Sequence, residues 1–500
     1  MIRILSKEQA QLGDRIAKKY ITKKKLMDNA GKLSAQFFLE NIKDPFNQKV
    51  LIFAGKGDNG GDAIIMHHYL LEYGIDSKLY IFDVKASNSI LKRYKIFKRN
   101  IINDLSSDCI EKYDWFVDGI FGIGLNRKLT GRYKKIIKML GNEKIISIDI
   151  PSGLDCNKGL PISQNFINPQ YVLCMGGYKY ANLINEGKRS FEKTYLIDIG
   201  LEKAYSEIAE VDTYLIDCKF IKEIIKKDDL LRNKYSNACS IISSSEEYSG
   251  AGLLSLSATL SAGSTYVKNL VPGKIIDRYS HIAESVDFAI GNKGYFLETD
   301  YSSVIKADIG AKKQPILIGP GLGSKISTRK FTSKILKFLK TKDNACVIDA
   351  SGFEPIYNTY KIKDLPKNCI LTPHLGEAKK IFPQIDFSSP IDASRKIRKI
   401  IGNRVLILKG PSTIIITSKG NYYIVNNGNS LLATAGSGDV LSGIILAFLS
   451  KGYNIDHASI LGVYCHALCS QVYFQKHSRY TMLSRDIIKI LPAVLDEVFS

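Results

Sequence analysis

The chain has 500 residues, too many for one ordinary hydrophobic core, so its length predicts two or three domains. Its apolar fraction of 45% with 24% charged residues is typical of a globular protein. It has no run of about 18 apolar residues, which excludes a membrane-spanning helix. The net charge of +21 is spread along the chain without an arginine-rich arm, which argues against nucleic-acid binding but is compatible with a polyanionic small substrate.

The N-terminal sequence MIRILSKEQAQLGDRI carries charges early and lacks the apolar core of a secretion signal, so we expect a cytoplasmic protein. The nine cysteines form no C-x-x-C pair and no zinc-binding spacing. Cys465 and Cys469 lie four residues apart in an apolar helical pattern, which favours reduced core thiols over a metal site.

Two amphipathic helices are predicted first, near residues 6–18 and 23–41. Continuous apolar runs then alternate with longer helical stretches, which predicts a parallel sheet covered on both faces. These runs are KVLIFA, SKLYIF, DWFVDGI, KIISIDI, YVLCM and TYLIDI. We therefore predict an α/β domain over residues 1–215.

The segment CKFIKEIIKKDDLLRNKYS is the most charged stretch in mid-chain, and we interpret residues 216–236 as a linker. The alternation then restarts, which predicts a second α/β domain over residues 237–500. Its predicted strands are ACSIIS, TYVKNLV, SVDFAI, PILIG, ACVIDA, CILTP, VLILKG and TIIITS. A small-residue helix, GAGLLSLSATLSAG, follows the first of them, and three helices near 438–451, 456–475 and 485–499 close the chain.

A glycine-rich turn, AGKGDNGGDA, joins the first apolar run to a helix. Gly55, Gly57 and Gly60 match the G-x-G-x-x-G pattern, in which backbone N–H groups approach the phosphates of a dinucleotide. Asp58 and Asp62 are unfavourable beside a pyrophosphate unless a cation intervenes, and their oxygens suit a hard cation. The alternative is a tight turn with a structural role alone.

Two later strands of the first half also end in polar residues. Asp118 is followed by a glycine loop with Arg127 and Lys128, which suits phosphate recognition. Asp149 ends the next apolar run. Because ligands gather at the carboxyl ends of parallel strands, one crevice is predicted to hold Asn59, Asp118, Asp149 and Ser152.

The motifs MDNAG, GKGDNGGDA, DGIFGIGLNRKL and DIPSGL, followed by Lys179, resemble in this order the NAD(P)H-hydrate epimerase domain. The resemblance implies a Rossmann-like three-layer α/β/α fold and a potassium ion held by Asn59, Asp118 and Ser152. It also implies Asp149 as the acid–base group at the hydroxylated C6 of the substrate, with Lys179 as a helper. The residues implied to bind the hydrated dinucleotide are Asp58, Asn59, Gly60, Gly61, Asp62, Gly122, Ile123, Gly124, Leu125, Asn126, Arg127, Lys128 and Asp149.

The turn AGSGD of the second half leads directly into an apolar helix. Backbone N–H groups from Ala435 to Gly438 are predicted to face an anion there. Asp439, in the first helical turn, is placed to take a proton from an attacking hydroxyl, which predicts a phosphoryl-transfer site. The turn is not a Walker A loop, which requires G-x-x-x-x-G-K-[ST]. The alternative is an ordinary carboxylate at a helix N-terminus.

The turns LIGPGLGS, LTPHLGE and LKGPST follow other apolar runs of this half, and His374 in the second is either a ligand contact or a structural histidine. With SGAGLL and LLATAGSGDVLSG they resemble the ADP-dependent NAD(P)H-hydrate dehydratase, of ribokinase-like fold. The resemblance implies nucleotide (ADP/AMP) binding by Lys409, Gly410, Pro411, Ser412, Thr413 and Gly438. It implies contacts with the hydrated dinucleotide from Ala251, Gly323, His374 and Asp439.

The chain departs from both families at a few positions. Asp58 and Ala63 stand in a loop that is usually Asn-Asn-Gly-Gly-Asp-Gly, and the added charge of Asp58 is expected to weaken binding of an anion. Ala63 lies just inside the helix and should be neutral. Ser351 replaces a second acidic residue after Asp349, and SIISSSEEYSGAG lacks the usual glycines after its first strand.

Together the two resemblances imply a bifunctional repair enzyme. The first domain would interconvert the R and S epimers of NADHX and NADPHX, with K⁺. The second would dehydrate the S epimer with ADP and Mg²⁺, regenerating NAD(P)H and releasing AMP and phosphate. The alternatives are a ribokinase-like small-molecule kinase fused to a non-catalytic nucleotide-binding domain, and a non-enzymatic scaffold. We expect these small molecules as partners, no nucleic acid or membrane, and a homo-oligomer.

Overall fold

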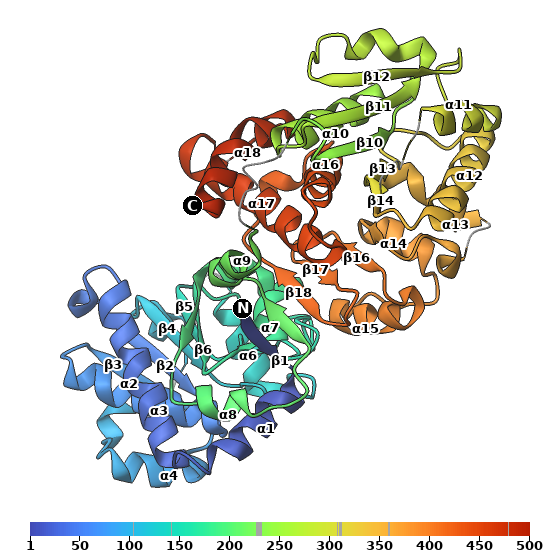
Figure 1. The fold of residues 1–500 in the computed structure, drawn as a ribbon. Coiled ribbons are helices and arrows are strands. Elements are labelled where there is room, and N and C mark those ends of the chain that lie inside the picture. The colour runs from blue at the N-terminus through green and yellow to red at the C-terminus, as the bar shows by residue number, and fades with distance from the viewer. Residues whose placement is uncertain are drawn as a thin grey trace. The chain divides into compact units, whose positions relative to one another are not determined.

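The computed structural model divides into two compact units, Arg3–Val211 and Met1–Ile2 with Asp212–Ser500. Figure 1 draws the first unit in blue to green and the second in green to red. The structure describes residues 1–103, 105–141, 143–226, 233–307, 309, 313–358, 361–478 and 480–500. Each unit combines helices with parallel strands, so the predicted α/β class is confirmed.

The N-terminal unit is built on parallel strands in the order β3-β2-β4-β5-β6-β8. Near its N-terminus, Ile4 of β1 pairs in parallel with Tyr178 of β7. The strands are β1 (Ile2–Leu5), β2 (Val50–Ala54), β3 (Ser77–Ile81), β4 (Trp115–Gly119), β5 (Ile145–Ile148), β6 (Tyr171–Met175), β7 (Tyr178–Lys179) and β8 (Thr194–Ile197). The helices are α1 (Lys7–Ala17), α2 (Lys23–Asn41), α3 (Asp58–Glu72), α4 (Val84–Arg93), α5 (Ser107–Ile110), α6 (Gly131–Met139), α7 (Tyr180–Leu183) and α8 (Glu202–Ser206).

Strand β2 is buried along its whole length because both faces of the sheet are covered. Leu51 and Phe53 pack with Ile136 and Ile137 of α6 in one apolar cluster. Alternate residues of a strand point to opposite faces, and α3 packs across β2 and β4. A Cβ at Gly119 would lie 2.4 Å from the Cβ of Ala63, so α3 sits unusually close to the sheet.

The second unit has parallel strands from β12 to β16 and an antiparallel hairpin, in the order β12-β11-β10-β13-β14-β15-β16-β17-β18-β9. The strands are β9 (Thr213–Leu215), β10 (Ala238–Ile242), β11 (Tyr266–Pro272), β12 (Ser285–Ile290), β13 (Ile316–Ile318), β14 (Cys346–Ile348), β15 (Cys369–Leu371), β16 (Val405–Leu408), β17 (Thr413–Ile416) and β18 (Tyr422–Val425). The helices are α9 (Cys218–Ile224), α10 (Ser249–Ser261), α11 (Tyr301–Lys306), α12 (Ile326–Lys342), α13 (Glu354–Asn358), α14 (Leu375–Ile381), α15 (Pro390–Ile401), α16 (Ser437–Ser450), α17 (Ile455–Lys476) and α18 (Ser484–Phe499).

The segment 216–236, interpreted from the sequence as a linker, includes the helix α9. Phe220, Ile221 and Ile224 of α9 belong to the apolar core of the second unit. Residues 227–232 of the segment lie outside the described part of the chain. The hairpin strand β18 was not among the predicted strands, because its run YYIV is short and follows the turn after β17 closely.

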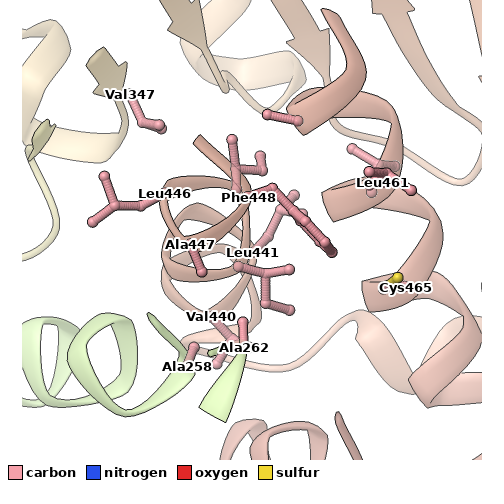
Figure 2. Close-up of a cluster of buried hydrophobic side chains, with 14 of the residues drawn as sticks. Ala258, Ala262, Val347, Val440, Leu441, Leu446, Ala447, Phe448, Leu461 and Cys465 are labelled. Atoms are coloured by element: carbon pink, nitrogen blue, oxygen red, sulfur yellow. The ribbon is translucent and has the colours of Figure 1, made fainter. Parts of the chain in front are cut away.

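Helix α16 runs through the centre of the second unit's core, with side chains such as Val440 and Phe448 buried. Figure 2 shows it beside Ala258 of α10 and Ala262, which directly follows α10, with Leu461 and Cys465 of α17 nearby. The helix is buried almost all round, as expected for its continuous apolar sequence. None of the described helices is both long and apolar enough to cross a membrane.

Glycine at position 443 allows α16 to pack against α10. A Cβ there would lie 2.3 Å from the carbonyl oxygen of Ser255, so we expect Gly443→Ala to destabilise the unit by about 1–3 kcal/mol, as overpacking does. Gly250→Ala is the matched control, because a Cβ at Gly250 meets nothing within 4 Å and should be neutral or stabilising. Urea unfolding of both variants measures the difference, and equal stability would contradict the packing account.

Candidate functional site

The N-terminal unit contains a pocket of about 760 Å³ at the carboxyl ends of its strands. The pocket is lined by the loop after β2, the loop after β4, the residues after β5 and the helices α1 and α2. The predicted residues that line it are Asp58, Asn59, Asp62, Gly122, Ile123, Gly124, Leu125, Asn126, Arg127 and Asp149. Gly60, Gly61 and Lys128 do not line it, so a contact from them stays a prediction.

An ion pair lies at the base of the pocket. The ammonium of Lys179 donates to Asp149 Oδ1 at 2.5 Å and to the Met175 carbonyl at 2.7 Å. Only 3% of the Lys179 side chain and 11% of the Asp149 side chain are exposed. Burial alone would lower the pKa of Lys179, but the charge of Asp149 and its hydrogen bond hold that pKa well above the usual value.

The backbone around Asp149 is unusual. Its φ of 67° lies in the left-handed region, which non-glycine residues rarely adopt. Hydrogen bonds fix the conformation: its N–H donates to Leu173 at 2.7 Å, and Asn182 Nδ2 donates to its carbonyl at 3.0 Å. Strained backbone that surrounding structure maintains is typical of functional sites.

The predicted potassium ligands lie together in one hydrogen-bonded group. Ser152 Oγ donates to Asp118 Oδ1 at 2.5 Å, and Ser147 Oγ and the Ser152 N–H donate to Oδ2. Asn59 Nδ2 donates to the carbonyls of Phe121 and Ile148, which leaves its Oδ1 without a hydrogen bond to the described residues. Burial raises the pKa of Asp118, and the hydrogen bonds from Ser152 oppose that rise.

Asp58, the residue that departs from the epimerase family, pairs with Lys23 of α2 at 2.6 Å. Both side chains are largely exposed, so the pair compensates the extra charge rather than stabilising the fold. Asp62 is buried one turn further along α3. Burial, with the charges of Asp58 and Asp149, holds the pKa of Asp62 well above its usual value.

The glycines of the G-x-G-x-x-G pattern serve close packing. A Cβ at Gly55 would lie 1.9 Å from the Ile120 carbonyl, and one at Gly60 would lie 1.9 Å from the Gly55 carbonyl. At Gly61 it would meet the Met27 side chain at 1.9 Å. Among the three glycines of the pattern, only Gly57, the N-cap of α3, lines the pocket, and no described residue comes within 4 Å of a Cβ placed there. The pattern therefore brings α3 and the neighbouring loop together beneath the pocket.

In the second unit, Asp439 lies in the first turn of α16, behind the N-cap Gly436 with φ 85°. The first N–H groups of a helix have no partner within it, so this end can receive an anion. Burial, followed by the charge of Asp349, raises the pKa of Asp439 to about 7, and Lys409 opposes the rise. A carboxyl group with this pKa suits proton transfer near neutral pH.

Lys409, directly after β16, lies over the N-terminus of α16. A Cβ at Gly438 would lie 3.1 Å from its Nζ, and that Nζ donates to Asp349 Oδ1 at 3.0 Å. Ser442 of α16 donates to the other oxygen of Asp349. Burial alone would lower the pKa of Lys409, but the charge of Asp349 raises it above the usual value. The structure thus brings Lys409, Gly438 and Asp439 together.

His374 caps helix α14. Its Nδ1 accepts from the N–H groups of Gly376 at 3.0 Å and Glu377 at 3.3 Å, while Glu377 accepts from the His374 N–H at 2.8 Å. The backbone of His374 pairs with that of Lys409 in an isolated parallel β-bridge, and the His374 ring is exposed. A structural role is therefore established, and its contact with the hydrated dinucleotide stays a prediction.

The remaining predicted residues lie at neighbouring strand ends. A Cβ at Gly321 would lie 3.0 Å from that of Ala251, so the turn after β13 meets the start of α10. Gly323 has a φ of 78°, in the left-handed region where a residue with a side chain would be strained. Its N–H donates to Ser351 Oγ at 3.2 Å. Ser351 thus supports the turn where the family has an acid. The turn 410–413 is joined to Asn426 by a hydrogen bond from Ser412 Oγ.

Sequence reasoning missed two residues near these sites. Asp14 of α1 lines the N-terminal pocket, although its helix was interpreted only as amphipathic. His466 of α17 lies 3.1 Å from Ser437 Oγ, and burial lowers its pKa to about 4, so it is neutral there. Neither belongs to a local motif, so no sequence signal marked them.

Comparison with known families accounts for both units. The NAD(P)H-hydrate dehydratase family model matches residues 239–493, and the model for the YjeF-related protein N-terminus matches residues 23–181. A bifunctional NAD(P)H-hydrate repair enzyme of Dictyoglomus turgidum is 32% identical over 519 aligned positions, covering 99% of this chain and 98% of that protein. The chain belongs to the family of bifunctional NAD(P)H-hydrate repair enzymes, which combine an epimerase and an ADP-dependent dehydratase.

Other relatives show the same pattern along the chain. A repair enzyme of the same description from Thermofilum pendens is 27% identical, covering 99% of this chain and 95% of that protein. Among solved structures, an ADP/ATP-dependent NAD(P)H-hydrate dehydratase from Bacillus subtilis is 23% identical with a TM-score of 0.48, covering 56% of this chain and 97% of that one. The two family models and the full-length relatives confirm the predicted enzyme class, and the kinase alternative is not favoured.

Removing the lysine of the buried Lys179–Asp149 pair should destabilise the protein more than removing the lysine of the exposed Lys23–Asp58 pair. Lys179→Met leaves Asp149 buried without its partner, so we expect a loss of stability of about 3–5 kcal/mol. Lys23→Met removes an exposed partner of Asp58 and should cost about 1 kcal/mol or less. Urea unfolding of both variants provides the comparison. Equal losses would show that the Lys179–Asp149 pair is not buried in solution.

Proposed function

We propose that the N-terminal pocket is the epimerase site and that Asp149 is its acid–base group. The support is the Lys179–Asp149 pair, in which a buried lysine holds a strand-end carboxylate inside a dinucleotide-sized pocket. Lys179 orients the carboxylate and compensates its charge. The pocket residues named above would contact R- and S-NAD(P)HX, with Arg127 suited to the pyrophosphate.

We propose a potassium ion beside the pocket, with Asn59, Asp118 and Ser152 as its ligands. These residues supply amide, carboxylate and hydroxyl oxygens in one buried group, and no described residue donates a hydrogen bond to Asn59 Oδ1. A cation there would offset the buried charge of Asp118 and a substrate phosphate nearby. The ion's role would be structural and electrostatic.

In the second unit we propose phosphoryl transfer at the N-terminus of α16. Asp439 would take the proton of the substrate's C6 hydroxyl, whose oxygen then attacks the β-phosphorus of ADP. The bond between phosphorus and the AMP oxygen breaks, and the helix N-terminus stabilises the phosphoryl charge. Loss of phosphate from C6, together with a proton from C5, then restores the ring double bond, giving NAD(P)H, AMP and phosphate.

Nucleotide contacts would come from Lys409, Gly410, Pro411, Ser412, Thr413 and Gly438. Substrate contacts would come from Ala251, Gly323, His374 and Asp439. The position of Lys409 over Gly438 supports this assignment, because it places a cation where phosphates would meet the helix. Asp349 and Asp439 are close enough to affect each other's charge, which fits Mg²⁺ accompanying ADP. Residues 1–215 and 237–500 are proposed as the two catalytic domains, with a cytoplasmic location and a homo-oligomeric state.

Two substitutions separate the proposed activities. We expect Asp149→Asn to lower epimerisation by at least about 100-fold while leaving dehydration of the S epimer unchanged. Asp439→Asn should do the reverse, because it removes the base of phosphoryl transfer. Chromatographic separation of the epimers measures the first activity without nucleotide, and recovery of NADH absorbance with ADP measures the second. Loss of both activities in either variant would contradict the division of labour.

The pKa of Asp439 sets the pH dependence of the dehydratase. The raised pKa of about 7 means that the carboxylate form, the active base, disappears as the pH falls through 7. We therefore expect kcat/KM to be roughly tenfold lower at pH 6 than on its alkaline plateau. The charge of Asp349 is the second-largest cause of the raised pKa of Asp439, after burial. Asp349→Asn removes this charge, so the midpoint of the pH profile of kcat/KM should move below pH 7. A midpoint that stays fixed in Asp349→Asn would assign the titration to another group.

A further inference from the structure

Helix α1 contributes a carboxyl group to the N-terminal pocket that no motif of the epimerase accounts for. Asp14 lines the pocket together with Gln11 and Arg15 of the same helix. Its side chain is open to the solvent that fills the pocket, and protein surrounds it on the other sides. A ligand in the pocket could therefore touch it directly.

The position of Asp14 is fixed by the packing of α1. The preceding residue is Gly13, where a Cβ would lie 2.3 Å from the ring of Tyr205, so the helix backbone rests on that ring. The start of α1 is secured by a capping box between Ser6 and Gln9. Arg3 binds the carbonyl of Tyr205 at 2.8 Å. Asp14 therefore stands on a rigid element.

The titratable groups near enough to interact electrostatically with Asp14 come from five other elements. They are Lys179 of β7, Asp149 after β5, Asp58 of α3, Lys23 of α2 and Tyr205 of α8. The surrounding protein raises the pKa of Asp14, Lys179 opposes the rise, and Asp149 and Asp58 add to it. The pKa of Asp14 therefore lies above the ordinary value of an aspartate in water.

We propose that Asp14 is the second proton-transfer group of the epimerase, acting on the ring nitrogen of the hydrated nicotinamide while Asp149 acts on the C6 hydroxyl. The proposal rests on the epimerase function proposed above. Inversion at a carbon that carries both a hydroxyl and a nitrogen needs one group to remove a proton and another to supply one. Asp149 and Asp14 enter the pocket from different elements, as this chemistry requires.

The step balances without any further reactant. Asp149 takes the proton of the C6 hydroxyl, the oxygen electrons form C6=O, and the C6–N1 bond breaks. Asp14 gives its proton to N1, so the ring opens to an aldehyde and an N–H group. After rotation about C5–C6, N1 attacks the other face of C6. The N1 proton returns to Asp14 and the new hydroxyl takes its proton from Asp149.

Asp62 is the rival for this role, since its pKa is also raised and it lines the same pocket. It is only 9% exposed, however, and lies one turn into α3. Asp14 is the more accessible of the two and has Lys179 as its strongest charged neighbour. Accessibility to the ligand favours Asp14 as the group that exchanges a proton with N1.

The test uses the full chain and the isolated R epimer of hydrated NADH without nucleotide. We expect Asp14→Asn to lower the kcat of epimerisation by about 100-fold, with KM changed by less than about twofold. The alkaline limb of the wild-type pH profile, where the acid loses its proton, should disappear in this variant. Asp14→Glu should restore part of the rate, because it restores the acid.

Glu8→Gln is the matched control, an acid-to-amide change on the same helix outside the pocket lining, and it should keep the wild-type rate. Urea unfolding reports that the N-terminal unit of each variant is folded, and dehydration of the S epimer with ADP reports the same for the second unit. A wild-type rate in Asp14→Asn, or a rise in KM alone, would overturn the proposal. The proposal would also be overturned if the alkaline limb of the epimerisation pH profile disappeared in Asp62→Asn and not in Asp14→Asn. A wild-type protein that does not epimerise would refute the proposed function itself.

Discussion

The ion pair between Lys179 and Asp149 organises the N-terminal site. Both groups are removed from solvent, so neither charge is stable there without the other. The left-handed backbone at Asp149 is held by two hydrogen bonds, one from its N–H to Leu173 of β6 and one from Asn182 Nδ2 to its carbonyl. The second unit contains a related pair, Lys409 with Asp349. There the lysine's partner is not the proposed base. Asp439 stands beside the pair, and its pKa of about 7 follows from burial and the charge of Asp349.

Both arrangements depend on the same geometric constraint. Parallel strands end at one edge of a sheet, so the turns that follow them must share a small space. Glycines satisfy this constraint where backbone meets backbone, as at Gly55 and Gly60. The dinucleotide pattern in the first half thus reflects packing beneath the pocket, while Asp58, Asn59 and Asp62 face the pocket itself. Polar side chains, rather than the glycines alone, give the site its chemistry.

Much of this could be predicted from the sequence. Long apolar runs and capped helices predicted β2, β5 and α16 closely, because burial and periodicity are local signals. Strand-end residues such as Asp149 were predicted since each directly follows such a run. Asp14 could not be, because only the tertiary packing of Gly13 on Tyr205 brings its helix to the pocket. The capping role of His374 and the pairing of Lys409 with Asp349 likewise depend on how separate loops meet.

One chain is proposed to repair both epimers of a damaged cofactor through two distinct sites. The most direct measurement is the progress curve of NADH recovery from an equal mixture of R- and S-NADHX, with excess ADP and the wild-type protein. We expect absorbance to return to the value for the whole mixture, faster than the protein-free epimerisation allows, with one AMP released per NADH. Recovery that stops at half of the mixture, or that needs no nucleotide, would contradict it.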